Sequence, residues 1–396
     1  MLFQTLDEKN ECVAIFQDGD LIWKEIPDNL TKTWKYSAFL EDVQGVSYAN
    51  LYLAGKSLSS VCPEELKEEW EKINSKLKAF YRSFVEGKIN LSENCFFELV
   101  PHKFLLEYCD IKNKITEHVF KNYQKPENYD FLLDLTKLST KIKYQKLNVD
   151  LSAIKPQMSK YKTRQFAKKI AKVPPYVKYD IFGTKTGRLT TEKNSFPLLT
   201  MAKDYRSILK PQNDWFVELD YNAAELRMLL ALSGKRQPDQ DIHDWNVENV
   251  YRGKLTREQA KKRIFSWLYN PNSNDFLSSR AYDRGSVKNK YWDGKCVNTA
   301  YNRHIESDEF HALNYIIQST LSDMVLRQAI KLDKLLENNK TKIAFIVHDS
   351  VVLDMSRDDA GLVKEIFRTF SNTDFGNFKT NVSAGKNFGD LKTLWI

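Results

Sequence analysis

Two aspartates stand where apolar segments end. Asp220 closes the apolar stretch 215–219, and Asp349 separates the apolar stretches 343–347 and 351–353. A carboxylate beside a buried strand is unfavourable unless a cation or hydrogen-bond donors compensate it. If the two strands are neighbours, the pair could hold two divalent ions, and sites of this kind serve phosphoryl transfer. Taken alone, each aspartate is better explained as a turn or cap residue.

Four side chains in the segment 254–269 recur at every fourth residue. They are Arg257, Lys261, Phe265 and Tyr269. Residues four apart advance by only about 40° around a helix, so the four would line one face. Two cations followed by two aromatic rings suit a nucleoside triphosphate, with its phosphates on the cations. An amphipathic helix with core aromatics and solvated cations explains the spacing equally well.

Positive charge is concentrated in the middle of the chain. Residues 151–210 contain 14 Lys and Arg but three Asp and Glu, a net +11 against +8 for the whole chain. Such a segment is typical of a surface that binds a phosphate backbone, although a solvated helix face is the alternative. The loop 183–191 lacks the spacing of a P-loop, so Arg188 is either a phosphate contact or part of an ordinary turn.

The elements that must position these residues can be read from hydrophobic periodicity. The length of 396 residues predicts two to three domains or subdomains. Residues 12–16 and 21–23 flank a turn at 18–20 and predict a hairpin. Strands are expected at 215–220, 343–347 and 351–353, the last two as a hairpin with Asp349 at its turn. Helices are expected at 64–86, 101–122, 127–147, 223–232, 254–269 and 309–337.

Composition excludes several classes of protein. Five widely spaced cysteines without a C-x-x-C motif argue against a disulfide scaffold or a structural zinc site. The N-terminal residues are acidic where a signal peptide would be basic, and no run of about 18 apolar residues exists. We therefore expect a cytoplasmic protein with no membrane partner.

Taken in order, the motifs resemble the polymerase domain of family A DNA polymerases. The segment 186–189 (TGRL) is similar to the family's T-G-R-L, 220–227 (DYNAAELR) to its motif A and 241–243 to the D-I-H that follows. The four residues at 257–269 match motif B, R-x3-K-x3-F-x3-Y. Residues 314–319 resemble the segment N-x-x-x-Q, 347–350 (VHDS) motif C, and 383–388 the C-terminal segment.

The resemblance implies roles at the catalytic centre. Asp220 and Asp349 would bind two Mg²⁺ ions, for which Mn²⁺ could substitute, and the carbonyl of Tyr221 would complete the site. Arg257, Lys261 and His243 would hold the triphosphate, and Lys261 could protonate the leaving pyrophosphate. Glu225 would exclude a ribose 2′-hydroxyl, Phe265 would face the sugar and Tyr269 would pack near the template base.

The resemblance also implies the fold and the DNA contacts. The fold class is α+β, a right hand in which the palm is an antiparallel sheet with helices. The expected parts are a β-rich N-terminal module of unknown role (1–60), a helical thumb-like region (61–179), palm (180–240 and 318–396) and fingers (241–317). The expected DNA contacts are Arg188, Asn314, Gln318, His348, Lys168, Lys169 and Lys172.

Three residues depart from the family pattern. Ala223 stands where motif A usually has Gln, Asn270 follows motif B where Gly is usual, and Ser350 replaces the usual Glu of motif C. A hydroxyl at position 350 contributes no charge, so metal binding would depend more on Asp220 and Asp349. None of the three changes removes an essential group.

The sequence therefore predicts a DNA-templated DNA polymerase that extends a primer with dNTPs. Fewer than 100 residues precede the thumb-like helices, and residues 18–20 do not match the D-x-E of a 3′–5′ exonuclease, so no proofreading is expected. By analogy this build suggests a phage replicase, active as a monomer in the host cytoplasm, with accessory replication proteins as further candidate partners. The alternatives are a catalytically weak or inactive DNA-binding or priming factor, a single-subunit RNA polymerase and a metal-dependent nuclease.

Overall fold

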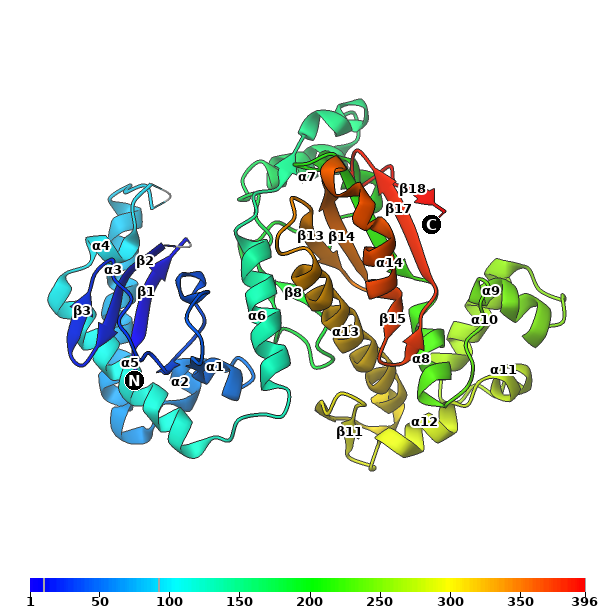
Figure 1. Ribbon diagram of the computed structural model, residues 1–396, viewed down its shortest axis with the longest axis horizontal. Coiled ribbons are helices and arrows are strands. Elements are labelled where there is room, and N and C mark those ends of the chain that lie inside the picture. Colours follow the sequence, from blue (N-terminus) through cyan, green and yellow to red (C-terminus); the bar gives the residue numbers. More distant parts are fainter. Residues whose placement is uncertain (10, 92, 396) are drawn as a thin grey trace. The chain divides into compact units, whose positions relative to one another are not determined.

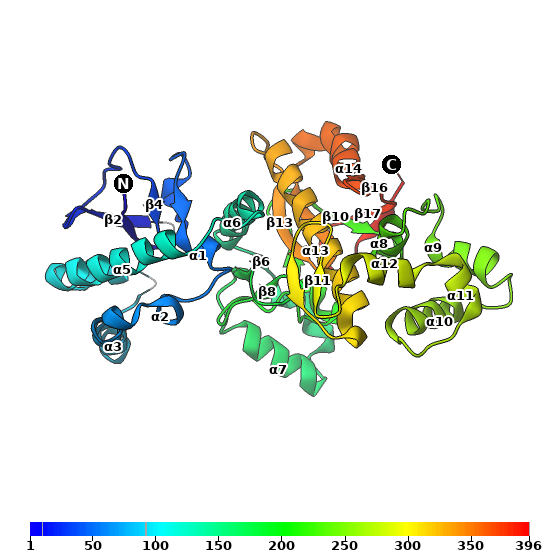
Figure 2. The ribbon, with the colours of Figure 1, turned by 90° about the horizontal axis from the view of Figure 1, so that it is seen from below.

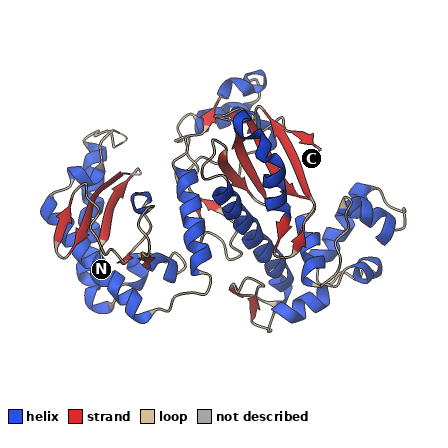
Figure 3. Ribbon diagram, in the orientation of Figure 1, coloured by secondary structure: helices blue, strands red, loops and turns tan. Residues whose placement is uncertain are grey.

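The structure is a computed structural model that describes residues 1–9, 11–91 and 93–395. The chain divides into two compact units, Met1–Tyr144 and Gln145–Ile396. Both units mix helices and strands (Figure 3). Each is described by itself below.

The first unit begins with a three-stranded antiparallel sheet. Its strands β1 (Gln4–Glu8), β2 (Glu11–Gln17) and β3 (Asp20–Ile22) pair in the order β1-β2-β3. Asp18 and Gly19 form the turn between β2 and β3 with φ of 52° and 94°, a left-handed conformation that glycine adopts readily. This confirms the hairpin predicted from the apolar runs and the turn residues.

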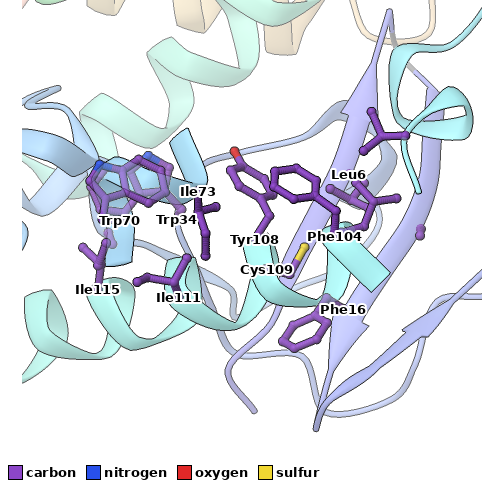
Figure 4. Packing of buried hydrophobic residues seen from close by; sticks show 14 of the residues in the cluster. Leu6, Phe16, Trp34, Trp70, Ile73, Phe104, Tyr108, Cys109, Ile111 and Ile115 are labelled. Atoms are coloured by element: carbon purple, nitrogen blue, oxygen red, sulfur yellow. The ribbon is translucent and has the colours of Figure 1, made fainter. Parts of the chain in front are cut away.

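Helices cover the apolar side of this sheet and share one core with it. The core joins Leu6 and Phe16 of the strands to Trp70 and Ile73 of α3 (Glu64–Glu86) and to Phe104 of α5 (His102–Asn122) (Figure 4). Because the sheet has little apolar cover of its own, the expected boundary at residue 60 falls inside this unit. The remaining elements are β4 (Lys32–Thr33), a 3₁₀ turn (Ala38–Leu40), β5 (Ser47–Tyr48), α1 (Ala49–Tyr52), α2 (Leu58–Val61), α4 (Phe96–Leu99) and α6 (Tyr129–Lys143).

The second unit is built on a five-stranded antiparallel sheet in the order β13-β14-β10-β17-β18. These strands are β13 (Lys342–Val347), β14 (Ser350–Met355), β10 (Trp215–Tyr221), β17 (Thr380–Gly385) and β18 (Lys392–Leu394). The long helix α13 (Glu309–Leu335) and α14 (Val363–Ser371) pack on one face of the sheet (Figure 1). The helix α7 (Tyr161–Ile170) lies on the other side (Figure 2).

Side chains of β10 alternate between the two faces of this sheet. Leu219 and Tyr221 are buried on one face, where the Tyr221 ring stacks on Phe370 of α14. Glu218 and Asp220 therefore point to the opposite face, away from the covering helices. Two strands of this sheet, β13 and β14, form the hairpin predicted from the apolar runs, and Asp349 lies in its turn.

A helical segment follows β10, and it contains the predicted helix in which four side chains recur at every fourth residue. That helix is α10 (Arg257–Tyr269), and it starts later than residue 254 because the Thr256 hydroxyl and the Gln259 side chain form a capping box. Its neighbours are α8 (Ala224–Leu232), α9 (Ile242–Trp245), a π-helical turn (Asn246–Val250), α11 (Phe276–Ala281) and α12 (Arg284–Tyr291).

Short elements complete the second unit. They are β6 (Asn148–Val149), a 3₁₀ helix (Leu151–Gln157), β7 (Tyr179–Asp180), β8 (Thr190–Thr191), a 3₁₀ helix (Lys203–Ile208), β9 (Leu209–Lys210), β11 (Cys296–Asn298), β12 (His304–Glu306), a 3₁₀ helix (Arg357–Leu362), β15 (Asn372–Thr373) and β16 (Gly376–Asn377). In the described part of the chain, no helix combines the length and apolarity that a membrane crossing requires.

A buried ion pair fixes the connection between the β11–β12 hairpin and α13. Arg303 contacts both carboxylate oxygens of Asp323, at 2.7 and 3.1 Å, and the Asp323 side chain is only 2% exposed. Removing one member of such a pair leaves an uncompensated buried charge, which is strongly destabilising.

We predict that Asp323→Asn lowers the free energy of unfolding by about 3 kcal/mol in urea denaturation. The matched control is Glu309→Gln on the same helix, which breaks the exposed pair of Glu309 with Lys288 and should cost less than about 1 kcal/mol. Equal effects of the two variants would contradict the buried pair's role.

Candidate active site

Two carboxylates meet at the centre of the second unit's sheet. The antiparallel register pairs Asp220 of β10 with Ser350 of β14, the residue that directly follows Asp349. The two carboxylates are close enough that Asp349 raises the pKa of Asp220. Burial, then Glu218 and Asp349, raise the pKa of Asp220 to about 7, and burial raises the pKa of Asp349. Both acids are thus difficult to ionise without a compensating cation.

The carboxylate oxygens of Asp220 and Asp349 are suitable ligands for a divalent cation. Carboxylate oxygens are the ligands that Mg²⁺ prefers, usually one or two from the protein together with oxygens of the substrate and water. Within residues 1–9, 11–91 and 93–395, no group of three His, Cys, Asp or Glu side chains is arranged to enclose a metal ion. The Tyr221 side chain points into the core, where its hydroxyl donates to the Phe370 carbonyl, so only the backbone of Tyr221 could contribute to the site.

Arg188 and Glu225 lie beside this pair. The Arg188 guanidinium is 3.3 Å from the Glu225 carboxylate and 3.9 Å from Asp349. Tyr269, at the end of α10, interacts with Glu225 and with Gln318 of α13. Burial and Glu225 together hold the pKa of Tyr269 above its usual range. The structure thus brings together five residues that lie in five separate motifs of the sequence: Arg188, Glu225, Asp349, Tyr269 and Gln318.

The loop that carries Arg188 is shaped by its neighbour Gly187. Gly187 has a φ of +76°, and a Cβ atom there would lie 2.6 Å from a guanidinium nitrogen of Arg303. Arg303, held by Asp323, therefore packs directly against the loop. The sequence analysis identified Gly187 only as part of a motif and missed Arg303 and Asp323, because nothing local in the sequence pairs them with the loop.

One face of α10 carries the four predicted residues. Arg257 and Lys261 are exposed, whereas Phe265 and Tyr269 are half-buried and their rings stack with centroids 6.3 Å apart. The His243 ring of α9 is buried, lies 5.9 Å from the Phe265 ring, and has its pKa lowered by burial. Cations and rings therefore occupy the same face in the order that the spacing predicted.

Arg257 is held by acids that the site prediction did not include. It forms ion pairs with Asp241 at 3.0 Å and with Asp244 at 3.4 Å. Although burial opposes ionisation of Asp241, hydrogen bonds from Arg257 and Asn222 outweigh it and keep the pKa of Asp241 below its usual range. Asp241 is thus a charged partner of Arg257 in this structure.

Buried Arg227 ties this region to β10. Its guanidinium donates to the backbone carbonyl and the side chain of Asn222, at 2.8 and 3.0 Å, and to the carbonyls of Pro238 and Gln240. Asn222 in turn donates to Asp241 at 2.7 Å. The network fixes the start of α9, and with it His243, relative to Asp220. Arg227 was visible in the sequence only as the last letter of motif A.

Other predicted DNA contacts lie on separate elements. Asn314 and Gln318 are one turn apart on α13, and His348 is exposed in the β13–β14 turn with a φ of +54°. Lys168 and Lys169 of α7 and the nearby Lys172 are exposed, while α7 buries Thr163, Ala167 and Ile170. No described contact joins these lysines to Asp220 or Asp349, and their role stays a prediction.

Several buried polar atoms at the site have no hydrogen-bond partner among the described residues. Besides the Tyr269 hydroxyl, they are Arg188 Nε, His243 Nδ1 and Asn314 Oδ1. Buried polar atoms are satisfied in most native structures, so unsatisfied ones often mark the place of a ligand. All three belong to residues that the sequence analysis assigned to nucleotide or DNA binding.

Comparison with known proteins gives a fold but no sequence relative. No family model and no curated protein matches the sequence. Among solved structures, the chain is similar to the polymerase domain of Pol1 from M. smegmatis in complex with DNA primer–template and dNTP. The TM-score is 0.66 with 11% identity over 98% of this chain and 95% of that one. The fold is therefore the right-hand polymerase fold, α+β as predicted.

The raised pKa of Asp220 leads to a prediction for the metal-free protein. Below about pH 4 the carboxyl is protonated in both folded and unfolded chains. Between about pH 4 and pH 7 only the unfolded chain loses the proton, so the free energy of unfolding should fall as pH rises. We expect Asp220→Asn to flatten this decline in urea denaturation with EDTA present. Identical slopes in both proteins would contradict the raised pKa.

Proposed function

We propose that the chain is a DNA-templated DNA polymerase that extends a primer with dNTPs. The observation that carries the proposal is the meeting of Asp220 and Asp349 beside the Arg188–Glu225 contact. A protein that only binds DNA has no evident need for two neighbouring, partly buried carboxylates of which, among the described residues, only Asp349 forms an ion pair, with Arg188 at 3.9 Å. The fold and the sequence motifs support the same conclusion independently.

In this proposal Asp220 and Asp349 hold two Mg²⁺ ions, with the Tyr221 backbone carbonyl as a further ligand. Bound ions of this kind lower the pKa of the attacking primer hydroxyl and stabilise the charge that develops on the transferred phosphate. The two aspartates accept the ions in their ionised form. The strand pairing of β10, β13 and β14 fixes the backbone at Asp220 and at the turn that carries Asp349 before the substrates bind.

The nucleotide would bind along α10. Arg257, Lys261 and His243 would contact the triphosphate, and Lys261 would protonate the leaving pyrophosphate. Because Asp241 and Asp244 hold Arg257 in the free protein, incoming phosphate would share or replace these partners. Phe265 would face the sugar and Tyr269 the template base.

Selection of deoxyribose would fall to Glu225. Its ion pair with Arg188, at 3.3 Å, holds the carboxylate in one place, which a steric barrier to a 2′-hydroxyl requires. This contact favours a DNA polymerase over the alternative of a single-subunit RNA polymerase. Arg188, Asn314, Gln318 and His348 would contact the primer terminus or the minor groove, and Lys168, Lys169 and Lys172 the duplex backbone.

The proposal is tested by primer extension on a DNA template with Mg²⁺ and dNTPs. We expect Asp220→Asn and Asp349→Asn each to lower the extension rate by about 10³-fold or more, while primer–template affinity changes little. The matched control is Asp358→Asn, which removes an exposed carboxylate paired with Lys340 and should leave the rate unchanged.

Substrate choice in the same assay separates the alternatives. Extension with dNTPs but not rNTPs, and no trimming of a 3′-mismatched primer, is the expected result for a DNA polymerase without proofreading in this chain. Extension by either aspartate variant at the wild-type rate would contradict the metal assignment. Tight DNA binding without extension by the wild-type protein would favour a binding or priming factor.

A further inference from the structure

Glu218 is an unassigned carboxylate at the centre of the candidate site. It lies two residues before Asp220 on β10, so the two side chains share the face opposite α13 and α14. Of the charged groups that shift the pKa of Asp220, Glu218 raises it most, ahead of Asp349. Asp220 is therefore influenced by two other acids, Glu218 on its own strand and Asp349 in the β13–β14 turn.

Two hydroxyl groups hold the Glu218 carboxylate. Ser350 of β14 donates to Oε1 at 3.1 Å, and Ser383 of β17 donates to Oε2 at 3.4 Å. These strands flank β10 on its two sides, so the carboxylate is fixed from both. In the part of the chain that the structure describes, no Lys or Arg forms an ion pair with Glu218. The hydrogen bonds orient its charge without neutralising it.

Residue 350, which contacts Glu218, is a serine where the resembling family has an acid. Ser350 occupies the hairpin position at which motif C of the resembling family has an acid, and it is hydrogen-bonded to an acid on the next strand. A serine is short enough to leave room for the longer Glu218 side chain. The negative charge that position 350 lacks is thus carried by Glu218, whose carboxylate lies 3.1 Å from the Ser350 hydroxyl.

We propose that Glu218 is a positioning residue of the divalent-cation site and supplies from β10 the charge that position 350 lacks. The inference rests on the proposed polymerase function and concerns the same site. Glu218 would favour cation binding by its negative charge next to Asp220 and by orienting Ser350, the neighbour of Asp349. It is not required as a direct ligand of the cation. It would strengthen cation binding at Asp220 and Asp349 without contacting substrate.

The test measures Mn²⁺ binding without turnover. The full chain is mixed with dNTP and a primer–template whose primer ends in a dideoxynucleotide, and free Mn²⁺ is followed by electron paramagnetic resonance. We expect Glu218→Gln to weaken Mn²⁺ affinity by about tenfold through the lost charge. Glutamine keeps the size and the acceptor oxygen for Ser350, and thermal unfolding of each variant checks that it folds.

A double variant tests whether the carboxylate can act from position 350 instead of position 218. The double variant Glu218→Ser with Ser350→Glu moves the carboxylate back to the hairpin at nearly constant volume. We expect its Mn²⁺ affinity to return to within about twofold of the wild type, whereas Glu218→Ser alone should remain weak. The matched control is Glu365→Gln on α14, an exposed acid that should have no effect.

Each outcome decides between the two proposals. Wild-type Mn²⁺ affinity in folded Glu218→Gln, with loss in Asp220→Asn, would overturn the role of Glu218 and leave the polymerase proposal intact. Wild-type affinity in Asp220→Asn as well would contradict the metal site itself. Weak Mn²⁺ affinity in Glu218→Gln that is not restored in the double variant would show that an acid at position 350 cannot replace Glu218. That result would contradict the proposal that Glu218 supplies the charge missing from position 350.

Discussion

The whole site depends on the electrostatic cost of placing Asp220 and Asp349 side by side under partial burial. The sheet imposes this proximity, because the register of β10 against β14 places Asp220 opposite the residue after Asp349. Burial raises the pKa of both acids, and the neighbouring carboxylates Glu218 and Asp349 raise the pKa of Asp220 further. A divalent cation removes the cost, which explains why a fold would maintain such an arrangement.

Positioning is achieved by rigid elements and by a few buried polar contacts. Helices α13 and α14 cover one face of the sheet, which leaves the acids on the other. Arg227 and Asn222 connect β10 to Asp241, and through Asp241 to Arg257 on α10. Arg257, the cation proposed to bind nucleotide, is therefore connected through hydrogen bonds to the strand that carries Asp220. The Arg303–Asp323 pair similarly supports the loop around Gly187 that presents Arg188.

Much of the fold was predictable from the sequence because it depends on local periodicity. The apolar runs around 349 predicted the hairpin, and the four-residue repeat predicted the shared face of α10. The contact of Ser350 with Glu218 was not predictable, because it depends on strand register rather than on a motif. Strand periodicity alone would have placed Glu218 on the face of Asp220. The extent of the first unit could not be read from local periodicity either, because its core combines strands and helices that are far apart in the sequence.

The central claim is that Asp220 and Asp349 hold divalent cations when DNA and nucleotide are bound. Anomalous diffraction from crystals of the full chain with Mn²⁺, dNTP and a dideoxy-terminated primer–template tests it most directly. We expect Mn²⁺ peaks coordinated by the carboxylates of Asp220 and Asp349, next to the nucleotide phosphates. DNA and nucleotide bound in the site with no Mn²⁺ peak at either carboxylate would contradict it.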